Sequence, residues 1–188
     1  VGAGFIRDVV LAKLFGASLT VDLFRMAFAL PNLLSQTFGT VFVATMIPYI
    51  IRVQERSVTA KMQFYRQLLI FNMAVVLLLT VVGMTTLQFQ VQFFYPGISS
   101  QQVELLMNDM LYCWLIFLFV GLSFAMRAIY NSKGVFLPGA ATPLARAGLF
   151  VIILLVAVML SSSEAITHTH LAVFSAIAGF SVLLLHLL

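Results

Sequence analysis

Charged residues are scarce in this chain. Of its 188 residues only 9% are charged, while 62% are hydrophobic. A soluble domain typically has about 25% charged and about 45–50% apolar residues. Because a chain of this length still exposes roughly a third of its unfolded surface after folding, a water-soluble fold cannot hide so much apolar surface. The composition therefore excludes a soluble domain and predicts an integral membrane protein.

Residues that carry catalysis or bind metal are also few. The single cysteine, Cys113, excludes an intramolecular disulfide and a Cys-x-x-Cys site. The sequence contains no P-loop, no His-Glu-x-x-His and no Gly-x-Ser-x-Gly motif. His168 and His170 are spaced like a metal-binding pair, but no further ligand follows nearby. We predict no enzyme, no metal site, no cofactor and no nucleic-acid partner.

Long apolar runs are what the chain does contain. Membrane barrels need short segments of alternating polarity, whereas these runs are continuous and suit helices, which need about 20 residues to cross a bilayer. We predict an all-α polytopic membrane helix bundle of about six transmembrane helices. The predicted spans are 1–15, 22–51, 67–94, 104–130, 135–160 and 171–188. Because both ends of the chain are apolar, we interpret residues 1–188 as a fragment of a longer protein.

The connections between these spans differ in charge. The polar connector after the second span carries four basic residues, namely Arg52, Arg56, Lys61 and Arg66. Arg127 and Lys133 flank the turn after the fourth span. The connections after the third and fifth spans carry no basic residue, but hold Glu104, Asp109 and Glu164. Since short cytoplasmic loops are enriched in Lys and Arg, both ends of the chain are predicted to be cytoplasmic.

A charge within a span is costly and usually faces a cavity or a partner. Arg7 and Asp8 are adjacent in the first span, so they cannot form the usual i,i+4 pair. One interpretation is that Arg7 faces an aqueous cavity and presents its fork of donors to an anion such as phosphate, while Asp8 bonds to a neighbouring helix. The alternative is a simple ion pair, or an arginine that extends to the membrane surface.

Small and polar residues recur at three- and four-residue steps in the second span. They are Arg25, Ala29, Asn32, Ser35, Gln36, Gly39 and Thr40. This spacing places them on one helix face. The face is expected either to line a cavity or to pack tightly against another helix.

Arg146 lies about ten residues into the fifth span, which at about 1.5 Å per residue is near the middle of the membrane. An arginine at that depth cannot easily reach either membrane surface. We predict that Arg146 faces an anion.

Several of these segments resemble the MurJ (MviN) family, whose members flip the peptidoglycan precursor lipid II across the bacterial inner membrane. The similar segments are Gly4–Asp8, Ala12–Ser18, Asp22–Phe24, Ala27–Leu34 and Asn131–Pro138. The family belongs to the multidrug/oligosaccharidyl-lipid/polysaccharide exporter superfamily. The resemblance implies two six-helix lobes around a central cavity, of which this chain would be the N-terminal lobe.

The resemblance also implies roles for particular residues. Arg7 is similar to the family's cavity arginine, Asp8 to its neighbour, and Asp22 to the acidic residue that opens the second span. The sequence departs from the family where Ser35 and Gln36 replace a usual arginine pair. Conversely, Arg146 stands where the family commonly has asparagine. The substrate-binding residues expected on all these grounds are Arg7, Asp8, Asp22, Arg25, Asn32, Ser35 and Arg146.

The expected function is that of a flippase in the bacterial inner membrane. Its cargo would be a polyprenyl-diphosphate-linked saccharide, either lipid II or a similar cell-envelope precursor, moved by alternating access. Expected partners are this lipid-linked glycan, membrane lipid, a coupling sodium ion or proton, and proteins of cell-envelope biosynthesis. Two alternatives stay open: a cation-coupled antiporter of drugs or small molecules from the same superfamily, and a membrane scaffold that does not transport.

Overall fold

The described part of the chain is built from helices. The computed structural model describes residues 2–161 and 165–187, and these ranges contain no strand. The helices are α1 (Gly2–Phe15), α2 (Leu19–Gln54), α3 (Val58–Thr85), α4 (Leu87–Phe94), α5 (Ser100–Leu122), α6 (Phe124–Ser132), α7 (Leu137–Leu160) and α8 (His168–Leu187). The glycines that follow α1 and α6 have positive φ angles, 59° for Gly16 and 76° for Gly134. Other residues rarely adopt this conformation, which commonly ends a helix.

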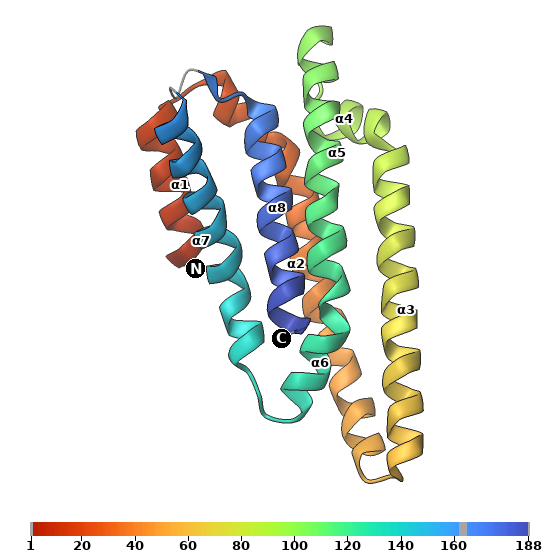
Figure 1. The fold of residues 1–188 in the computed structure, drawn as a ribbon. Coiled ribbons are helices and arrows are strands. Elements are labelled where there is room, and N and C mark those ends of the chain that lie inside the picture. The colour runs from red at the N-terminus through yellow and green to blue at the C-terminus, as the bar shows by residue number, and fades with distance from the viewer. Residues whose placement is uncertain (1, 162–164, 188) are drawn as a thin grey trace.

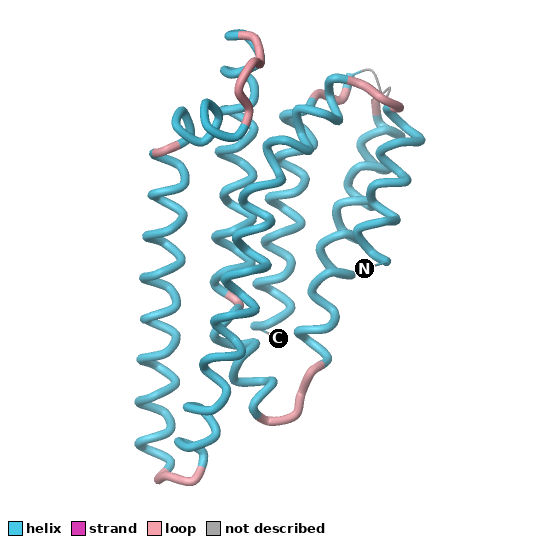
Figure 2. The backbone as a smooth tube through the Cα atoms, turned by 180° about the vertical axis from the view of Figure 1, so that it is seen from behind, coloured by secondary structure: helices cyan, strands magenta, loops and turns pink. Residues whose placement is uncertain are grey.

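The long helices run side by side in one bundle (Figures 1 and 2). The segment α5 packs against α2, α3 and α8, and α8 packs in turn against α7. The short helix α1 lies beside α7 at one edge, while α3 stands at the opposite edge (Figure 1). The connections α2–α3 and α6–α7 lie at the lower end in this view, so we call it the lower end of the bundle.

Within the described residues, five helical segments are long and apolar enough to cross a membrane. They are Leu19–Gln54, Val58–Thr85, Ser100–Ser132, Leu137–Leu160 and His168–Leu187. The segment Ser100–Ser132 combines α5 and α6 into one span. The helix α1 has 14 residues, fewer than the roughly 20 that a helix needs to cross a bilayer. These segments confirm the predicted all-α membrane bundle, and α1 corresponds to the short first span predicted over residues 1–15.

The polar connector predicted between the second and third spans is mostly helical. The helix α2 continues to Gln54 and α3 begins at Val58, so only Glu55, Arg56 and Ser57 lie between them. The hydroxyl of Ser57 accepts a hydrogen bond from the backbone N–H of Ala60 and caps α3. Sequence reasoning ended the helices where the apolar run ends, but a helix continues unhindered once it leaves the hydrocarbon.

The predicted third span is interrupted at Thr86, which separates α3 from α4. The side-chain amide of Gln90 donates to the carbonyl of Gly83 at 2.7 Å, and Trp114 Nε1 donates to Gln90 Oε1 at 3.3 Å. A Cβ atom at Gly83 would collide with the indole ring of Trp114. The indole of α5 therefore occupies the side-chain position that the glycine leaves free, and Gln90 joins the two helices.

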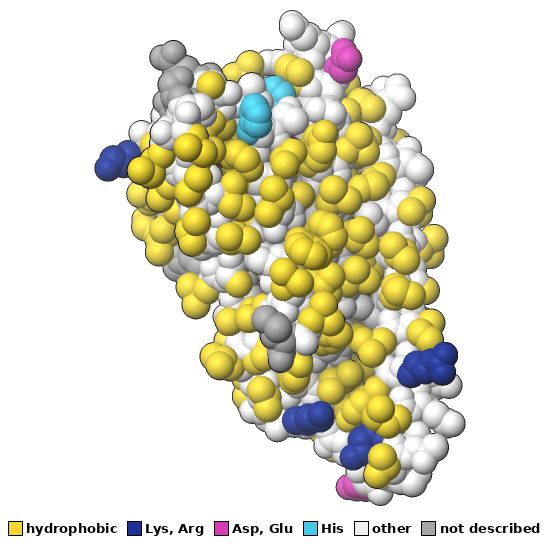
Figure 3. All heavy atoms as spheres, in the orientation of Figure 1, with side chains coloured by type: hydrophobic (Ala, Val, Ile, Leu, Met, Phe, Trp, Pro, Cys, Tyr) yellow, Lys and Arg dark blue, Asp and Glu magenta, His cyan; other side chains and the backbone are white. Residues whose placement is uncertain are grey.

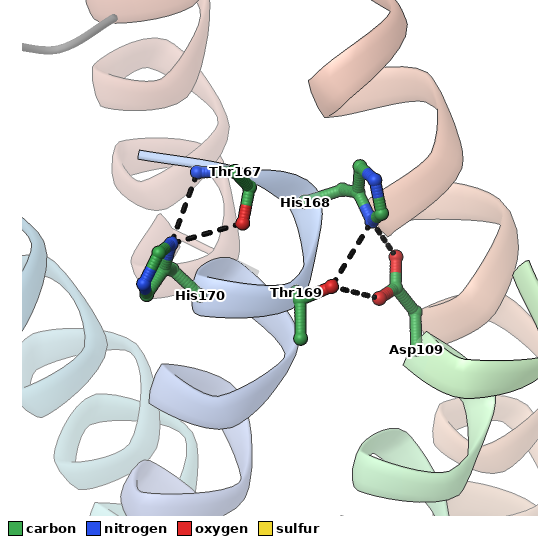
Figure 4. Close-up of polar contacts among 5 residues, drawn as sticks. All are labelled: Asp109, Thr167, His168, Thr169 and His170. Carbon is green, nitrogen blue, oxygen red and sulfur yellow. Dashed lines mark hydrogen bonds and ion pairs between the residues drawn. The ribbon is translucent and has the colours of Figure 1, made fainter. Parts of the chain in front are cut away.

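Asp109 was expected in a connection, but the structure corrects this: it lies inside α5 and its side chain is 0% exposed. Its carboxylate contacts His168 Nδ1 at 2.6 Å and accepts a hydrogen bond from the Thr169 hydroxyl at 2.9 Å (Figure 4). His170 points elsewhere, toward Thr167 (Figure 4). The two histidines thus have different partners. Glu164, the other acidic residue expected in a connection besides Glu104, lies outside the described residues.

Apolar side chains cover most of the visible face of the bundle, and most of the basic side chains on this face gather toward its lower end (Figure 3). This end includes the last turn of α2 with Arg52, the α2–α3 connection with Arg56, and Lys133 directly after α6. This face therefore has the apolar band and the charge asymmetry that are typical of a protein that spans a bilayer.

Candidate substrate-binding pocket

Arg7 in α1 points toward the bundle and is largely buried, with 18% of its side chain exposed. Its Nε and Nη2 atoms donate to Asp8 Oδ1 at 3.0 and 2.8 Å. The structure therefore shows the alternative, an ion pair between Arg7 and Asp8, and within the described residues Asp8 makes no bond to a neighbouring helix. The two side chains bend toward each other although their Cβ atoms point about 100° apart.

Arg146 in α7 lies close to Arg7. Both guanidinium groups approach the ring of Phe28 in α2, with their Cζ atoms 4.7 Å (Arg7) and 5.7 Å (Arg146) from its centroid. These distances are within the roughly 6 Å range of cation–π attraction. The two arginines that sequence reasoning singled out are thus brought together by the packing of α1 on α7 and by one aromatic ring of α2.

An aromatic cluster supports this ring. Phe28 contacts Phe24 at a centroid distance of 5.6 Å, and Phe24 stacks on Phe150 of α7 at 5.8 Å with 11° between the planes. Phe24 and Phe150 are 1% and 2% exposed. The ring that the guanidinium groups approach is therefore held by a tightly packed core.

Arg7, Phe28 and Arg146 line a common pocket with a volume of about 50 Å³. Its other lining residues are Gly4, Pro143, Ala147, Phe150, Ser175 and Ala178. Among the residues that the structure describes, no carboxylate lies within ion-pair distance of Arg146, and Asp8 is paired with Arg7. Asp8 pairs with Arg7 alone, so the charge of Arg146 is not balanced by a carboxylate of the described residues and the pocket has a net positive charge.

The other five predicted residues do not line this pocket. Asp22 and Arg25 are exposed on α2, Asn32 is half-buried, and Ser35 is 2% exposed. The polar face predicted on the second span divides in two. Ser35 and Gly39 are buried, and a Cβ atom at Gly39 would lie 2.5 Å from the Phe124 ring, so this part packs tightly. Arg25, Ala29, Gln36 and Thr40 remain exposed along α2.

Sequence reasoning missed Phe28, Pro143 and Ser175 as lining residues. Phe28 is not among the residues of the polar face predicted on the second span. One sequence signal was available, because Phe24 and Phe28 are spaced i,i+4 and present two rings on one helix face. Ser175 gave no signal beyond being a polar residue within an apolar run.

Together, the fold and this pocket define a polytopic α-helical membrane protein with a cationic pocket among its helices. The family model "Lipid II flippase MurJ" matches residues 11–188, a range that includes Arg146 and begins just after Arg7. A probable lipid II flippase MurJ of Buchnera aphidicola subsp. Schizaphis graminum (strain Sg) is 32% identical over 137 residues, covering 71% of this chain and 27% of that protein. The corresponding protein of Buchnera aphidicola subsp. Acyrthosiphon pisum (strain APS) is 30% identical over 148 residues, covering 75% of this chain and 28% of that protein.

The chain belongs to the MurJ lipid II flippase family. It spans about a quarter of the length of the curated relatives it matches. The family and the apolar helices together make it a multi-pass protein of the bacterial inner membrane.

Proposed function

We propose that this chain is the N-terminal lobe of a flippase that moves a polyprenyl-diphosphate-linked saccharide, either lipid II or a similar cell-envelope precursor, across the bacterial inner membrane. The observation that carries the proposal is the pocket where Arg7 and Arg146 meet over Phe28. A diphosphate is the anion that such cargo presents. Guanidinium groups bind phosphate oxygens through paired donors. Of the two here, Arg7 is paired with Asp8, and Arg146 has no ion-pair partner among the described residues.

The size of the pocket indicates which part of the cargo it would hold. Its volume of about 50 Å³ is well below the roughly 300–1,000 Å³ of pockets that enclose whole small molecules. The phosphate groups would lie at the arginines, while the saccharide would occupy space outside this pocket. The polyprenyl tail would remain in the hydrocarbon throughout, so moving it from one leaflet to the other would cost little free energy.

The proposed mechanism is alternating access between this lobe and a second one, with the diphosphate held near the middle of the membrane. Arg146 lies nine residues after the start of α7, which is about 14 Å along its axis. The basic connections at the lower end would face the cytoplasm, and both ends of the chain would be cytoplasmic. We propose a sodium or proton gradient as the energy source, and proteins of cell-envelope biosynthesis as partners. The role is transport without catalysis.

The test is translocation of a labelled lipid-linked oligosaccharide in proteoliposomes that contain the full-length protein. We expect Arg7→Gln and Arg146→Gln each to lower the initial rate at least tenfold, because each removes a cation from the diphosphate. The matched control is Lys13→Gln, which neutralises an exposed cation of the same helix as Arg7 and should leave the rate within twofold.

Other results would favour another function. Ion-driven export of a cationic dye, with no movement of lipid-linked sugars, would indicate an antiporter. Normal growth of a deletion strain that carries both arginine variants would indicate a scaffold, because the pocket would then be dispensable.

A further inference from the structure

A second pocket lies at the lower end of the bundle, between α3, α6 and the end of α8. Its volume is about 540 Å³. Arg66 enters from the first third of α3, Lys133 caps the C-terminal end of α6, and His186 comes from the last turn of α8. The first third of α3 and the α6–α7 connection both belong to the lower end of the bundle, which puts the pocket near the depth where lipid headgroups lie.

The charged side chains that line this pocket are both basic. Arg66 and Lys133 are exposed, and no ion pair within the described residues involves either of them. The Lys133 ammonium lies 5.9 Å from the centroid of the Tyr65 ring, which links the end of α6 to α3. No carboxylate is among the residues that line the pocket. The charge of the site is therefore complementary to an anion.

Two polar atoms in the pocket wall lack hydrogen-bond partners within the part of the chain that the structure describes. They are Tyr65 Oη and His186 Nε2, and the whole His186 residue is only 1% exposed. The other ring nitrogen of His186, Nδ1, lies 2.8 Å from the carbonyl of Val182. If Nδ1 carries the proton for this bond, Nε2 of the neutral ring is an acceptor. A ligand with hydroxyl groups can hydrogen-bond to Tyr65 Oη and His186 Nε2, and its negative charge can pair with Arg66 and Lys133.

The rest of the wall is apolar and opens sideways. Met62 and Ile70 on α3 and Leu187 on α8 are 64%, 49% and 57% exposed, and all three line the pocket. In a bilayer these side chains meet acyl chains. The pocket thus has a basic end and an apolar side, which is the polarity of a phospholipid and not of a free anion.

We infer that this pocket binds one anionic phospholipid with a hydroxyl-bearing headgroup, of the phosphatidylglycerol type. Its phosphate lies between Arg66 and Lys133, its headgroup hydroxyls face Tyr65 and His186, and its acyl chains run along α3. Basic pockets between membrane helices hold anionic headgroups in this way. Bound there, the lipid joins α3 to α6 and α8 at the lower end of the bundle.

The test is a thermal-unfolding titration of the full-length protein in a nonionic detergent, with phosphatidylglycerol, phosphatidylcholine or inorganic phosphate added. We expect phosphatidylglycerol to raise the unfolding midpoint in a saturable manner, and the other two additives to leave it unchanged. Arg66→Gln combined with Lys133→Gln should raise the half-saturating lipid concentration about 10- to 30-fold, because each basic residue near the headgroup adds about fivefold in affinity. Tyr65→Phe removes only a hydroxyl and should raise it about two- to fivefold.

The matched control neutralises two exposed arginines outside the pocket, Arg52→Gln and Arg56→Gln, with the same loss of charge. The half-saturating phosphatidylglycerol concentration of this control should stay within twofold of the native value. An equal loss in the control would mean that surface charge alone attracts the lipid. Equal stabilisation by phosphate would indicate a free-anion site, and equal stabilisation by phosphatidylcholine would indicate an apolar groove. Each of these three results overturns the inference.

Discussion

Asp109 of α5 and His168 of α8 meet between two spans, with Oδ2 and Nδ1 2.6 Å apart and the carboxylate closed to solvent. Thr169 donates to the second carboxylate oxygen at 2.9 Å, so both oxygens are satisfied. A buried charge is tolerated only with such partners. This contact fixes the start of α8 against the upper part of α5.

Replacing His168 with alanine should therefore destabilise the bundle. The substitution leaves the buried Asp109 carboxylate with Thr169 as its remaining partner, and we expect a loss of about 1–3 kcal/mol in the free energy of unfolding. The measurement is the unfolding midpoint of the purified protein in detergent. His170→Ala is the control, because His170 is exposed and its hydrogen-bond partner among the described residues is Thr167. Equal midpoints for the two variants would refute the structural role of the pair.

Phe28→Leu should slow translocation while leaving the protein folded. Leucine keeps an apolar side chain at the position but removes the ring that both guanidinium groups approach, and each cation–π contact contributes about 0.5–2 kcal/mol. We expect a rate about three- to tenfold lower in the proteoliposome assay. Phe71→Leu, at a 54% exposed position of α3, is the control. An unchanged rate for Phe28→Leu would show that the ring does not position the arginines.

Arg146→Lys separates the charge of this residue from its geometry. Lysine keeps the positive charge but loses the planar fork of donors. If Arg146 grips phosphate oxygens in pairs, the lysine variant should be about three- to tenfold slower than the native protein, yet faster than Arg146→Gln. A lysine variant as active as the native protein would mean that charge alone is needed at this position.

Gly83→Ala tests the contact between α3 and α5. The added methyl group collides with the indole of Trp114, and overpacking of this kind costs about 1–3 kcal/mol. Trp114 is the single tryptophan in residues 1–188. If any tryptophans elsewhere in the full-length protein are replaced, the remaining fluorescence reports on the contact between Trp114 and Gly83. We expect the emission maximum of Gly83→Ala to be red-shifted. Gly148→Ala is the control, since nothing lies within 4 Å of the added atom. Identical emission in both variants would contradict the predicted displacement of the indole.

The sequence predicted the membrane bundle because apolar runs of this length have few other stable structures. It also predicted that Arg146 faces an anion, since an arginine within an apolar run needs a partner or a cavity, and this stays a prediction. The partners themselves could not be predicted. Phe28 looked like any apolar residue of the second span, and Asp109 looked like a loop carboxylate because its partner, His168, lies far along the chain.

The helix boundaries that were missed have a related cause. The residues at positions 52–66 are too polar for hydrocarbon, and hydropathy therefore ended the span there, although Ser57 caps a helix that begins among them. The interruption at Thr86 depends on Gly83, Gln90 and Trp114, which two different helices supply. Contacts of this kind are made by the packing of the helices and have no local pattern.

The smallness of the arginine pocket has a consequence for how the cargo is chosen. A site that reaches only the phosphates would treat alike all lipids that share this linkage, whatever sugars they carry. Unrelated polyprenyl diphosphates should then compete with one another for the lobe, and discrimination between glycans would have to arise where the sugars themselves make contact. Exchanging this lobe between flippases of different cargo should accordingly leave their sugar preference unchanged.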